Sequence, residues 1–193
     1  MIRIVLASLV LASAISAPAD AFERLSPPKT FRFDASDGHY ESWWGRVSCP
    51  INAIRGIVRF DRYGQPTTRW HPAITVFVRK GEEKSGRLAR LAIRARFYRP
   101  PFESELGAAI DDSVDLGTRK FRSATGGQGT FTFLMSWNSG GDVVAQVGAE
   151  SLVVRMGTRP DTVNINGSTG AGSVTFEFGH VPEGKQDQCK PIA

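Results

Sequence analysis

Short segments of alternating apolar and polar residues run through most of the sequence, from Phe31 to Phe178, and glycine, proline or asparagine separates them. A two-residue period is typical of β-strands that bury one face. In Phe131–Trp137 the apolar residues Phe131, Phe133, Met135 and Trp137 share one phase, and Val174, Phe176 and Phe178 repeat it. About ten such segments predict an all-β fold, either an antiparallel two-sheet β-sandwich or a closed barrel, with at most one short helix.

The segment from Arg87 to Tyr98 is ambiguous, because leucine, alanine and arginine are good helix formers. We expect a strand there, since the apolar residues alternate without a break from Leu91 to Phe97 and proline follows closely. Residues 102–123 are the least regular and leave room for the short helix. The glycine-rich stretch Gly167–Gly172 predicts a hairpin turn before the last core strand.

The N-terminus has the features of a secretory signal peptide. A short positive start, Met1-Ile2-Arg3, precedes an apolar stretch from Ile4 to Ile15, and Ala19-Asp20-Ala21 fits a signal peptidase site. We expect residues 1–21 to be removed, with cleavage after Ala21, leaving one domain over residues 22–193. A frayed apolar helix is the alternative. The prediction is a periplasmic or secreted protein, and no later apolar run has the length of a transmembrane anchor.

The chain carries 24 basic and 19 acidic residues, a net charge of +5. In an exported protein this excess favours anionic partners such as an acidic polysaccharide, lipopolysaccharide or phospholipid head groups, whereas nucleic acid is a poor candidate.

Two kinds of side chain are suited to such partners. Adjacent Trp43 and Trp44 point to opposite faces of a strand, so one is expected to be exposed for a sugar ring, with burial of both in or beside the core as the alternative.

Arginines are the second feature, because a guanidinium binds carboxylate, sulfate or phosphate through paired hydrogen bonds. They alternate with apolar residues in two segments, which predicts that they face solvent on one side of each strand. If the two strands share a sheet, the five arginines form one basic surface; ordinary solvated charge is the alternative. The candidate ligand-binding residues are Trp43, Trp44, Arg55, Arg59, Arg90, Arg94 and Arg96.

Signals for catalysis or metal binding are weak. The three histidines, His39, His71 and His180, are far apart and form no metal motif. Glu103 and Glu105 are two positions apart, so on a strand their side chains share one face. They could supply the pair of carboxylates that glycoside hydrolysis requires. The carboxylates of Asp111, Asp112 and Asp115 are hard ligands suited to Ca²⁺, but their spacing matches no defined loop. For both clusters, solvated loop carboxylates are the simpler interpretation.

The last third of the chain resembles the concanavalin A-like lectin/glucanase sandwich, which includes laminin G-like modules. The similar parts are the hairpin formed by Phe131–Trp137, the turn Asn138–Asp142 and Val143–Val147, and the closing stretch Ser173–Phe178. The resemblance implies a jelly-roll sandwich, and members of this group often bind sugars, some with Ca²⁺. The acidic E-x-D-x-x-E strand motif of its glucanases is absent here, so no catalytic residue is transferred.

Three functions follow from these features. The first is an exported carbohydrate-binding module without catalytic activity. We expect it to need no cofactor and to bind an anionic glycan. The second is a polysaccharide hydrolase or lyase that uses carboxylates such as Glu103 or Asp112 with Tyr98 or His71. The third is a structural interaction module of the cell envelope. The oligomeric state is left open.

Export predicts a disulfide between Cys49 and Cys189, the two cysteines of the chain. The bond would close a loop of ~140 residues, which the chain-entropy model rates on the order of 5 kcal/mol. Mass spectrometry of the exported protein after non-reducing digestion should find the two cysteines in one cross-linked peptide pair. A free thiol at either position would contradict the prediction.

Overall fold

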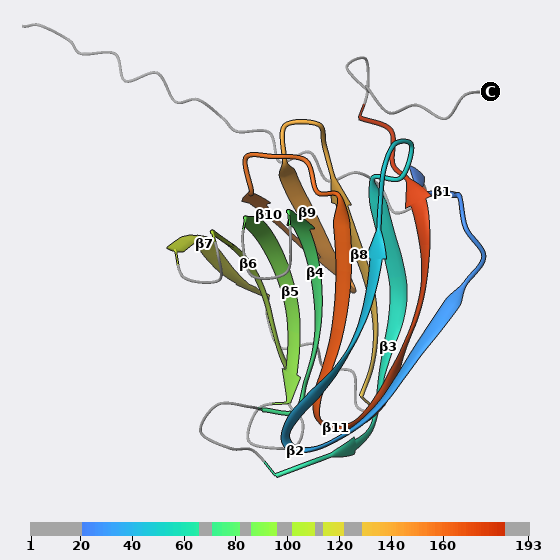
Figure 1. Ribbon diagram of the computed structural model, residues 1–193, viewed down its shortest axis with the longest axis vertical. Coiled ribbons are helices and arrows are strands. Elements are labelled where there is room, and N and C mark those ends of the chain that lie inside the picture. The colour runs from blue at the N-terminus through green and yellow to red at the C-terminus, as the bar shows by residue number, and fades with distance from the viewer. Residues whose placement is uncertain are drawn as a thin grey trace, which may run out of the picture.

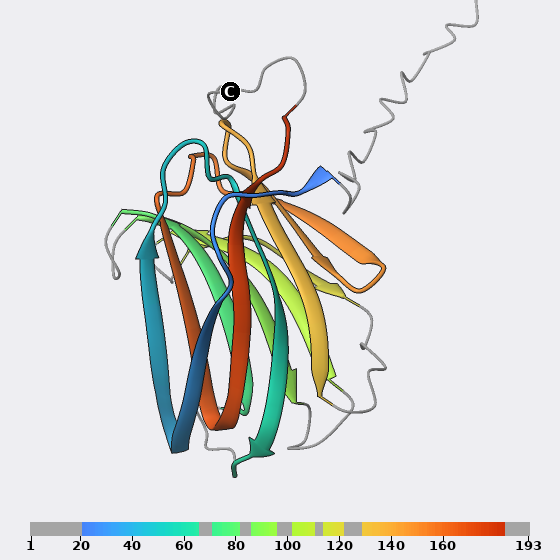
Figure 2. The same ribbon diagram turned by 90° about the vertical axis from the view of Figure 1, so that its right-hand side faces the viewer.

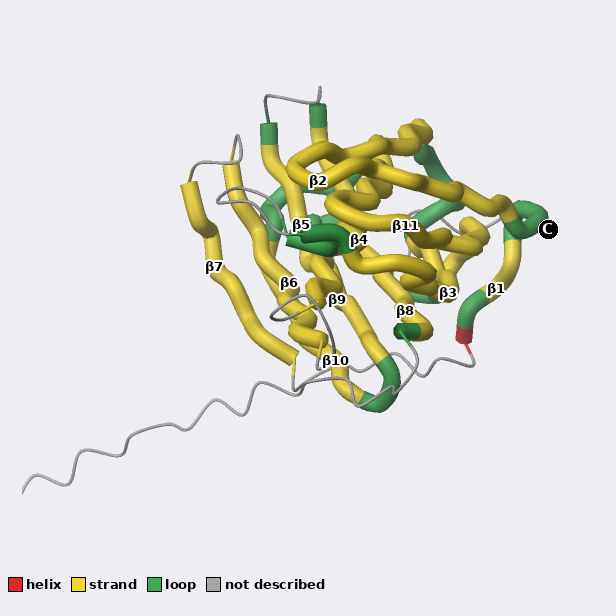
Figure 3. Tube along the Cα trace, turned by 90° about the horizontal axis from the view of Figure 1, so that it is seen from below, coloured by secondary structure: helices red, strands yellow, loops and turns green. Residues whose placement is uncertain are grey.

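A computed structural model describes residues 21–65, 71–81, 86–95, 102–110, 114–121 and 129–183. The described chain is built of β-strands, as Figures 1 and 3 show, and contains no α-helix; the short red segment before β1 in Figure 3 is a 3₁₀ residue at Ala21. The strands are β1 (Glu23–Arg24), β2 (Lys29–Arg46), β3 (Ala53–Tyr63), β4 (Ala73–Lys80), β5 (Arg87–Ala95), β6 (Phe102–Ile110), β7 (Val114–Phe121), β8 (Thr130–Trp137), β9 (Asp142–Val147), β10 (Glu150–Arg155) and β11 (Thr162–His180). All pairings between them are antiparallel, so the predicted all-β class is confirmed.

Two long strands, β2 and β11, lie side by side over almost their whole length and bend together. Ser168 pairs with Tyr40 on one side of the bend, and Gly170 pairs with Ala35 on the other, so β2 bulges between them. Figure 2 shows both strands folding over at the same end of the molecule. Each strand therefore belongs to two sheets.

The bend depends on glycines in β11. Gly167 and Gly172 both lie against the ring of Phe33: a Cβ atom at Gly167 would overlap that ring, and one at Gly172 would crowd it and overlap the Arg59 carbonyl oxygen. Between them, Thr169 has φ = 50° and Gly170 has φ = 155°. The predicted hairpin turn at Gly167–Gly172 is therefore wrong: the glycines lie inside one strand, where they make room for a phenylalanine in the crease.

The bend divides the strands into two sheets. The sheet named here the β5 sheet contains residues 40–46 of β2 and 162–168 of β11, followed by β4, β5, β6 and β7. The β3 sheet contains residues 29–35 of β2 and 170–179 of β11, followed by β3, β8, β9 and β10. Together they form the predicted two-sheet sandwich (Figure 2).

The core lies between the two sheets and takes one phase of each strand. Phe131, Phe133, Met135 and Trp137 are all at most 5% exposed, as the alternation predicts. They belong to one buried cluster with Val174, Phe176 and Phe178 from the neighbouring part of the β3 sheet. Ile74, Val76, Val78, Ala89, Leu91 and Ile93 supply the facing layer from the β5 sheet.

The ambiguous segment is strand β5 as far as Ala95, so the strand interpretation is confirmed for Arg87–Ala95, while residues 96–98 lie outside the described part. The irregular stretch contains β6 and β7, and no helix occurs in its described residues 102–110 and 114–121. Ca²⁺ candidates Asp111 and Asp112 fall outside the described residues.

Residues 1–20 also lie outside the described part, so the signal peptide stays a prediction. The same holds for the disulfide, because Cys49 is described and Cys189 is not. Within the described residues, no helix has the length and apolar character needed to cross a bilayer.

Replacing Phe133 by alanine should lower the free energy of unfolding by about 3–5 kcal/mol, because a buried ring is lost and a cavity is left. Its neighbour Thr132 points outward on the same strand. Thr132→Ala is therefore the matched control, with an expected change within about 0.5 kcal/mol. Denaturant unfolding of the two variants measures both values; a loss below about 1 kcal/mol for Phe133→Ala would contradict this account of the core.

Candidate functional site

The arginines predicted to share one surface lie on two. Arg55 and Arg59 project from the outer face of β3, where Val58 and Phe60 occupy the core phase. Arg90 and Arg94 project from the outer face of β5, where Leu91 and Ile93 point inward. The prediction of one basic surface is wrong, because β11 changes sheets at its bend and places β3 and β5 in opposite layers. Arg96 lies outside the described residues.

The arginines on β3 are also partly neutralised by carboxylates. Arg59 Nε lies 2.8 Å from Asp61 Oδ1, an exposed pair on one strand. Arg55 Nε lies 2.5 Å from Glu177 Oε1, on the neighbouring strand β11. Ion pairing of this kind removes much of the mutual repulsion that a bare row of arginines would carry.

The outer face of the β5 sheet gathers more of the predicted ligand residues. Strand register sets its rows, because cross-strand partners point to the same side. One row reads Trp44, Asn164, Phe77, Arg90, Gly107 and Thr118 across six strands. Neighbouring strands lie about 4.8 Å apart, so the row extends over roughly 24 Å.

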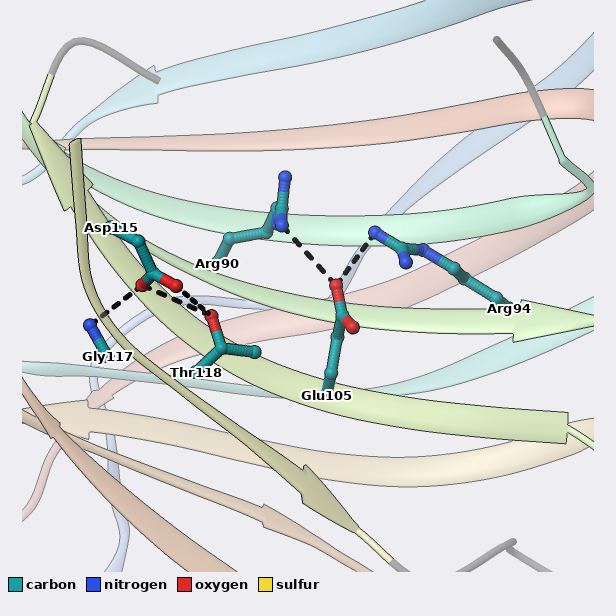
Figure 4. Close-up of polar contacts among 6 residues, drawn as sticks. All are labelled: Arg90, Arg94, Glu105, Asp115, Gly117 and Thr118. Carbon is teal, nitrogen blue, oxygen red and sulfur yellow. Dashed lines mark hydrogen bonds and ion pairs between the residues drawn. The ribbon is translucent and has the colours of Figure 1, made fainter. Parts of the chain in front are cut away.

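A three-residue cluster of Arg90, Glu105 and Arg94 occupies the middle of this face (Figure 4). Glu105 Oε1 accepts a hydrogen bond from Arg90 Nη2 at 3.3 Å and lies 2.7 Å from Arg94 Nη2. The glutamate side chain is 15% exposed, whereas the two arginine side chains are 36% and 37% exposed. The carboxylate therefore sits below two guanidinium groups that reach the solvent and that it holds in place.

A small hollow of about 160 Å³ adjoins this cluster and is lined by Arg90, Gly107, Asp115 and Thr118, among others. Asp115 Oδ1 accepts hydrogen bonds from the Gly117 amide at 2.8 Å and from Thr118 Oγ1 at 3.3 Å (Figure 4). These bonds fix the start of β7, where the register with β6 shifts. Since Gly107 has no side chain, the floor between Arg90 and Thr118 stays open.

Aromatic rings and an arginine stack at the other end of the row. The Arg79 guanidinium carbon lies 4.8 Å from the ring centre of Phe77 and 5.8 Å from that of Trp44. Trp44 is half-buried on this outer face. Trp43 points the other way and packs on Phe176, with ring centres 4.7 Å apart. The two tryptophans thus face opposite sides, as their adjacency predicts, although both are half-buried.

Several buried polar atoms on this face have no hydrogen-bond partner in the described chain. They are Asn164 Oδ1, Asn166 Oδ1 and Arg90 Nε. The Asn164 amide nitrogen is used, since it donates to the Trp43 carbonyl at 2.9 Å. The donor therefore belongs to the arginine cluster, and the two acceptors lie on β11, two strands away across the same face. Buried polar groups normally have partners, so this combination indicates a place for water or for hydroxyl groups of a ligand.

A larger pocket of about 770 Å³ opens where β2 and β11 reach the edge of this face, with Trp44, Arg46, Gly81 and Asp161 in its lining. Burial alone would raise the pKa of Asp161. Hydrogen bonds from Lys80 Nζ at 2.9 Å, the Gly81 amide at 3.3 Å and Thr162 Oγ1 at 3.2 Å outweigh this and hold its pKa below the usual value. The pocket therefore presents a fixed carboxylate beside an indole ring.

The residues suggested for catalysis are only partly brought together. Glu103 and Glu105 do share the outer face of β6, but Glu105 is engaged by two arginines. His71 is exposed. Tyr98 and Asp112 lie outside the described residues. In the described part of the chain, no group of three or more histidine, cysteine, aspartate or glutamate side chains is placed to hold a metal ion.

Neither a protein-family model nor a curated protein sequence matches the chain. Solved structures do match at low identity. Congerin II with lactose and MES bound has a TM-score of 0.51 and 8% identity, over 72% of this chain and 99% of that chain. A double mutant of congerin II gives 0.50 and 8%, with the same coverage. Porphyranase B from Zobellia galactanivorans gives 0.49 and 8%, over 84% and 79%.

The fold is a concanavalin A-like β-sandwich. This agrees with the resemblance drawn from the last third of the sequence and extends it, since the alignments cover about seven tenths of the chain. At identities near 8%, the similarity to these structures shows the fold and nothing about function. The site must therefore be argued from its own residues.

The sequence did not reveal the groups that complete the site. Asn164, Asn166 and Arg79 join Trp44 only through strand pairing, and Glu105 is selected as a partner by the register of β5 and β6. One signal was available: polar Asn164 and Asn166 alternate with apolar Val163 and Ile165. That alternation marks an outer face, but it does not say which strands lie beside it.

Replacing Glu105 by glutamine should destabilise the protein by about 1–2 kcal/mol, because two neighbouring arginines lose their shared counter-charge while solvent screens part of the effect. Asp61→Asn is the control, since Asp61 also pairs with an arginine but is exposed. Its expected cost is within about 0.5 kcal/mol. Urea unfolding of both variants tests the difference; equal losses would show that Glu105 has no special structural role.

Proposed function

We propose that this protein is an exported carbohydrate-binding β-sandwich and that its ligand is an anionic glycan bound on the outer face of the β5 sheet. The observation that carries the proposal is the Arg90–Glu105–Arg94 cluster, in which one carboxylate fixes two arginine side chains that are each about a third exposed. A planar guanidinium that is held in place loses little entropy on binding a carboxylate or sulfate group of a ligand.

The unpaired polar atoms of this face favour a hydroxyl-rich ligand. A sugar hydroxyl both donates and accepts hydrogen bonds, so different hydroxyl groups of one glycan can donate to Asn166 Oδ1 and accept from Arg90 Nε. At the end of the row, the ring of Trp44 and the fixed carboxylate of Asp161 line one pocket. An aromatic surface beside a few oriented polar groups is a common design of small-molecule sites.

The charge of the face favours an anionic chain over a neutral one. The basic residues on its outer positions are Arg46, Arg79, Arg90, Arg94 and Lys120, and the acidic residues are Glu103, Glu105 and Asp115. The excess is positive, in line with the net charge of +5 for the whole chain. Congerin II, which shares the fold, carries lactose in one of its structures, which is consistent with a sugar ligand.

Export is the second part of the proposal and rests on the signal-peptide pattern that ends at Ala21. A periplasmic or secreted location brings the protein into contact with polysaccharide and lipopolysaccharide. Mass spectrometry of the protein recovered outside the cytoplasm should show a chain that begins at Phe22. A chain that retains residues 1–21 would contradict export by this route.

Binding to heparin, a sulfated polysaccharide, should weaken roughly tenfold or more in Arg94→Gln, because one charge-assisted contact is lost. Arg59→Gln is the matched control, since it removes the same charge from the opposite face of the sandwich. Affinity should also fall as salt rises from about 50 to about 500 mM. Isothermal titration calorimetry measures each value, with a neutral glucan as the reference ligand.

Equal loss of heparin affinity in Arg94→Gln and Arg59→Gln would show attraction by overall charge and not by this face. A preference for the neutral glucan, unaffected by salt, would keep a glycan site and reject its anionic character.

A further inference from the structure

A second groove lies on the other side of the molecule, on the outer face of the β3 sheet. Its volume is about 470 Å³, within the range of small-molecule sites. Arg24, Arg55, Ile57, Leu134 and Glu177 are among the residues that line it. It shares no residue with the face proposed to hold the glycan.

A buried carboxylate organises one end of this groove. The side chain of Glu177 is only 9% exposed. Its Oε1 accepts a hydrogen bond from Arg55 Nε at 2.5 Å, and its Oε2 forms an ion pair with Arg24 Nε but accepts no hydrogen bond. A carboxylate this deep requires compensating charge, and two arginines from different strands provide it.

Both arginines keep capacity for a ligand. A guanidinium carries five N–H donors, and Glu177 is contacted through the Nε atoms. The terminal nitrogens of Arg24 and Arg55 donate to no other residue of the described chain. The two side chains are 56% and 40% exposed, and the ring of Phe22, 4.2 Å from the guanidinium carbon, supports Arg55. With two positive charges and one negative, this end of the groove attracts an anion.

The remainder of the groove is largely apolar. Ile57 is 48% exposed although it lies in the middle of a central strand. Leu134 is the cross-strand partner of Arg55 on β8 and lies diagonally opposite Ile57, so both side chains face the groove. An exposed isoleucine next to a hollow with an apolar lining is typical of a ligand groove.

We propose that this groove binds a small amphiphilic anion, a molecule with a carboxylate or phosphate head and an apolar chain. The head group pairs with the terminal nitrogens of Arg24 and Arg55, while Glu177 keeps both guanidiniums in position. The apolar chain lies over Ile57 and Leu134. Thr132 and Gln146 line the groove beside it. The site is independent of the glycan face, so either proposal can fail alone.

Calorimetric titration of the full chain with decanoate and with decyl phosphate, below their micelle concentrations, tests this site. Both should bind saturably at one site, and decanol, which has no charge, should bind at least about tenfold more weakly. The ratio between the two anions tells whether a carboxylate or a phosphate head fits better. Failure of both anions to saturate, or equal binding of decanol, would overturn the proposal.

Arg55→Gln should lower the affinity for the preferred anion roughly tenfold. Arg59→Gln is the control, since it makes the same change on the same face of the same strand but outside the groove. Equal losses in these two variants would overturn the site. Because Arg55 also supports Glu177, thermal unfolding of each variant must accompany the titration.

Ile57→Glu provides a second test that leaves both arginine–glutamate ion pairs intact. It places a negative charge where the apolar chain should lie, so anion binding should be lost while the fold remains. Arg94→Gln should leave anion binding unchanged, because Arg94 lies on the opposite face. Retained binding in Ile57→Glu, or loss in Arg94→Gln, would contradict the placement of the ligand.

Discussion

The backbone hydrogen bonds between β2 and β11 hold the two sheets together, because each of these strands contributes one half to each sheet. The pair can bend only where side chains are absent on the inner side of the fold. Gly167 and Gly172 provide that space, and the ring of Phe33 fills it. A side chain at either glycine would compete with this ring for the crease. The absence of side chains at these two residues therefore permits the bend that places the other strands in one layer or the other.

The same bend separates the charged residues into two clusters of similar design. On the β5 sheet, Glu105 lies between Arg90 and Arg94, and on the β3 sheet, Glu177 lies between Arg24 and Arg55. In each, a poorly exposed carboxylate fixes two better exposed arginines. Truncating such a carboxylate costs stability, whereas the arginines retain donors for a ligand. Each face of the sandwich therefore carries one cluster with two positive charges and one negative charge.

Those surroundings give the faces different chemistry. The β5 sheet presents asparagine amides, an indole ring and several further charges, which suit a polar ligand with many hydroxyl groups. The β3 sheet presents Ile57 and Leu134 next to its cluster, which suit an apolar chain. The arginines are alike in the two places, so the residues around them decide the class of ligand.

The sequence predicts the strands and the core well, because a two-residue period depends only on near neighbours. It predicts the site poorly, because the site depends on pairing over long distances. Glu177 lies 122 positions from Arg55, and nothing local to either residue marks the other as its partner. The glycines at 167–172 predict a turn from local sequence alone, and the contact with Phe33, far away in sequence, is what makes them a crease within one strand.

Backbone amide NMR during a titration with heparin reports directly which sheet the glycan contacts. Binding on the β5 sheet predicts shift changes in β4, β5 and β6, at residues 73–80, 87–95 and 102–110, with β3 and β8 unchanged. Changes confined to β3 and β8, or a saturated complex without changes in β5 and β6, would contradict it.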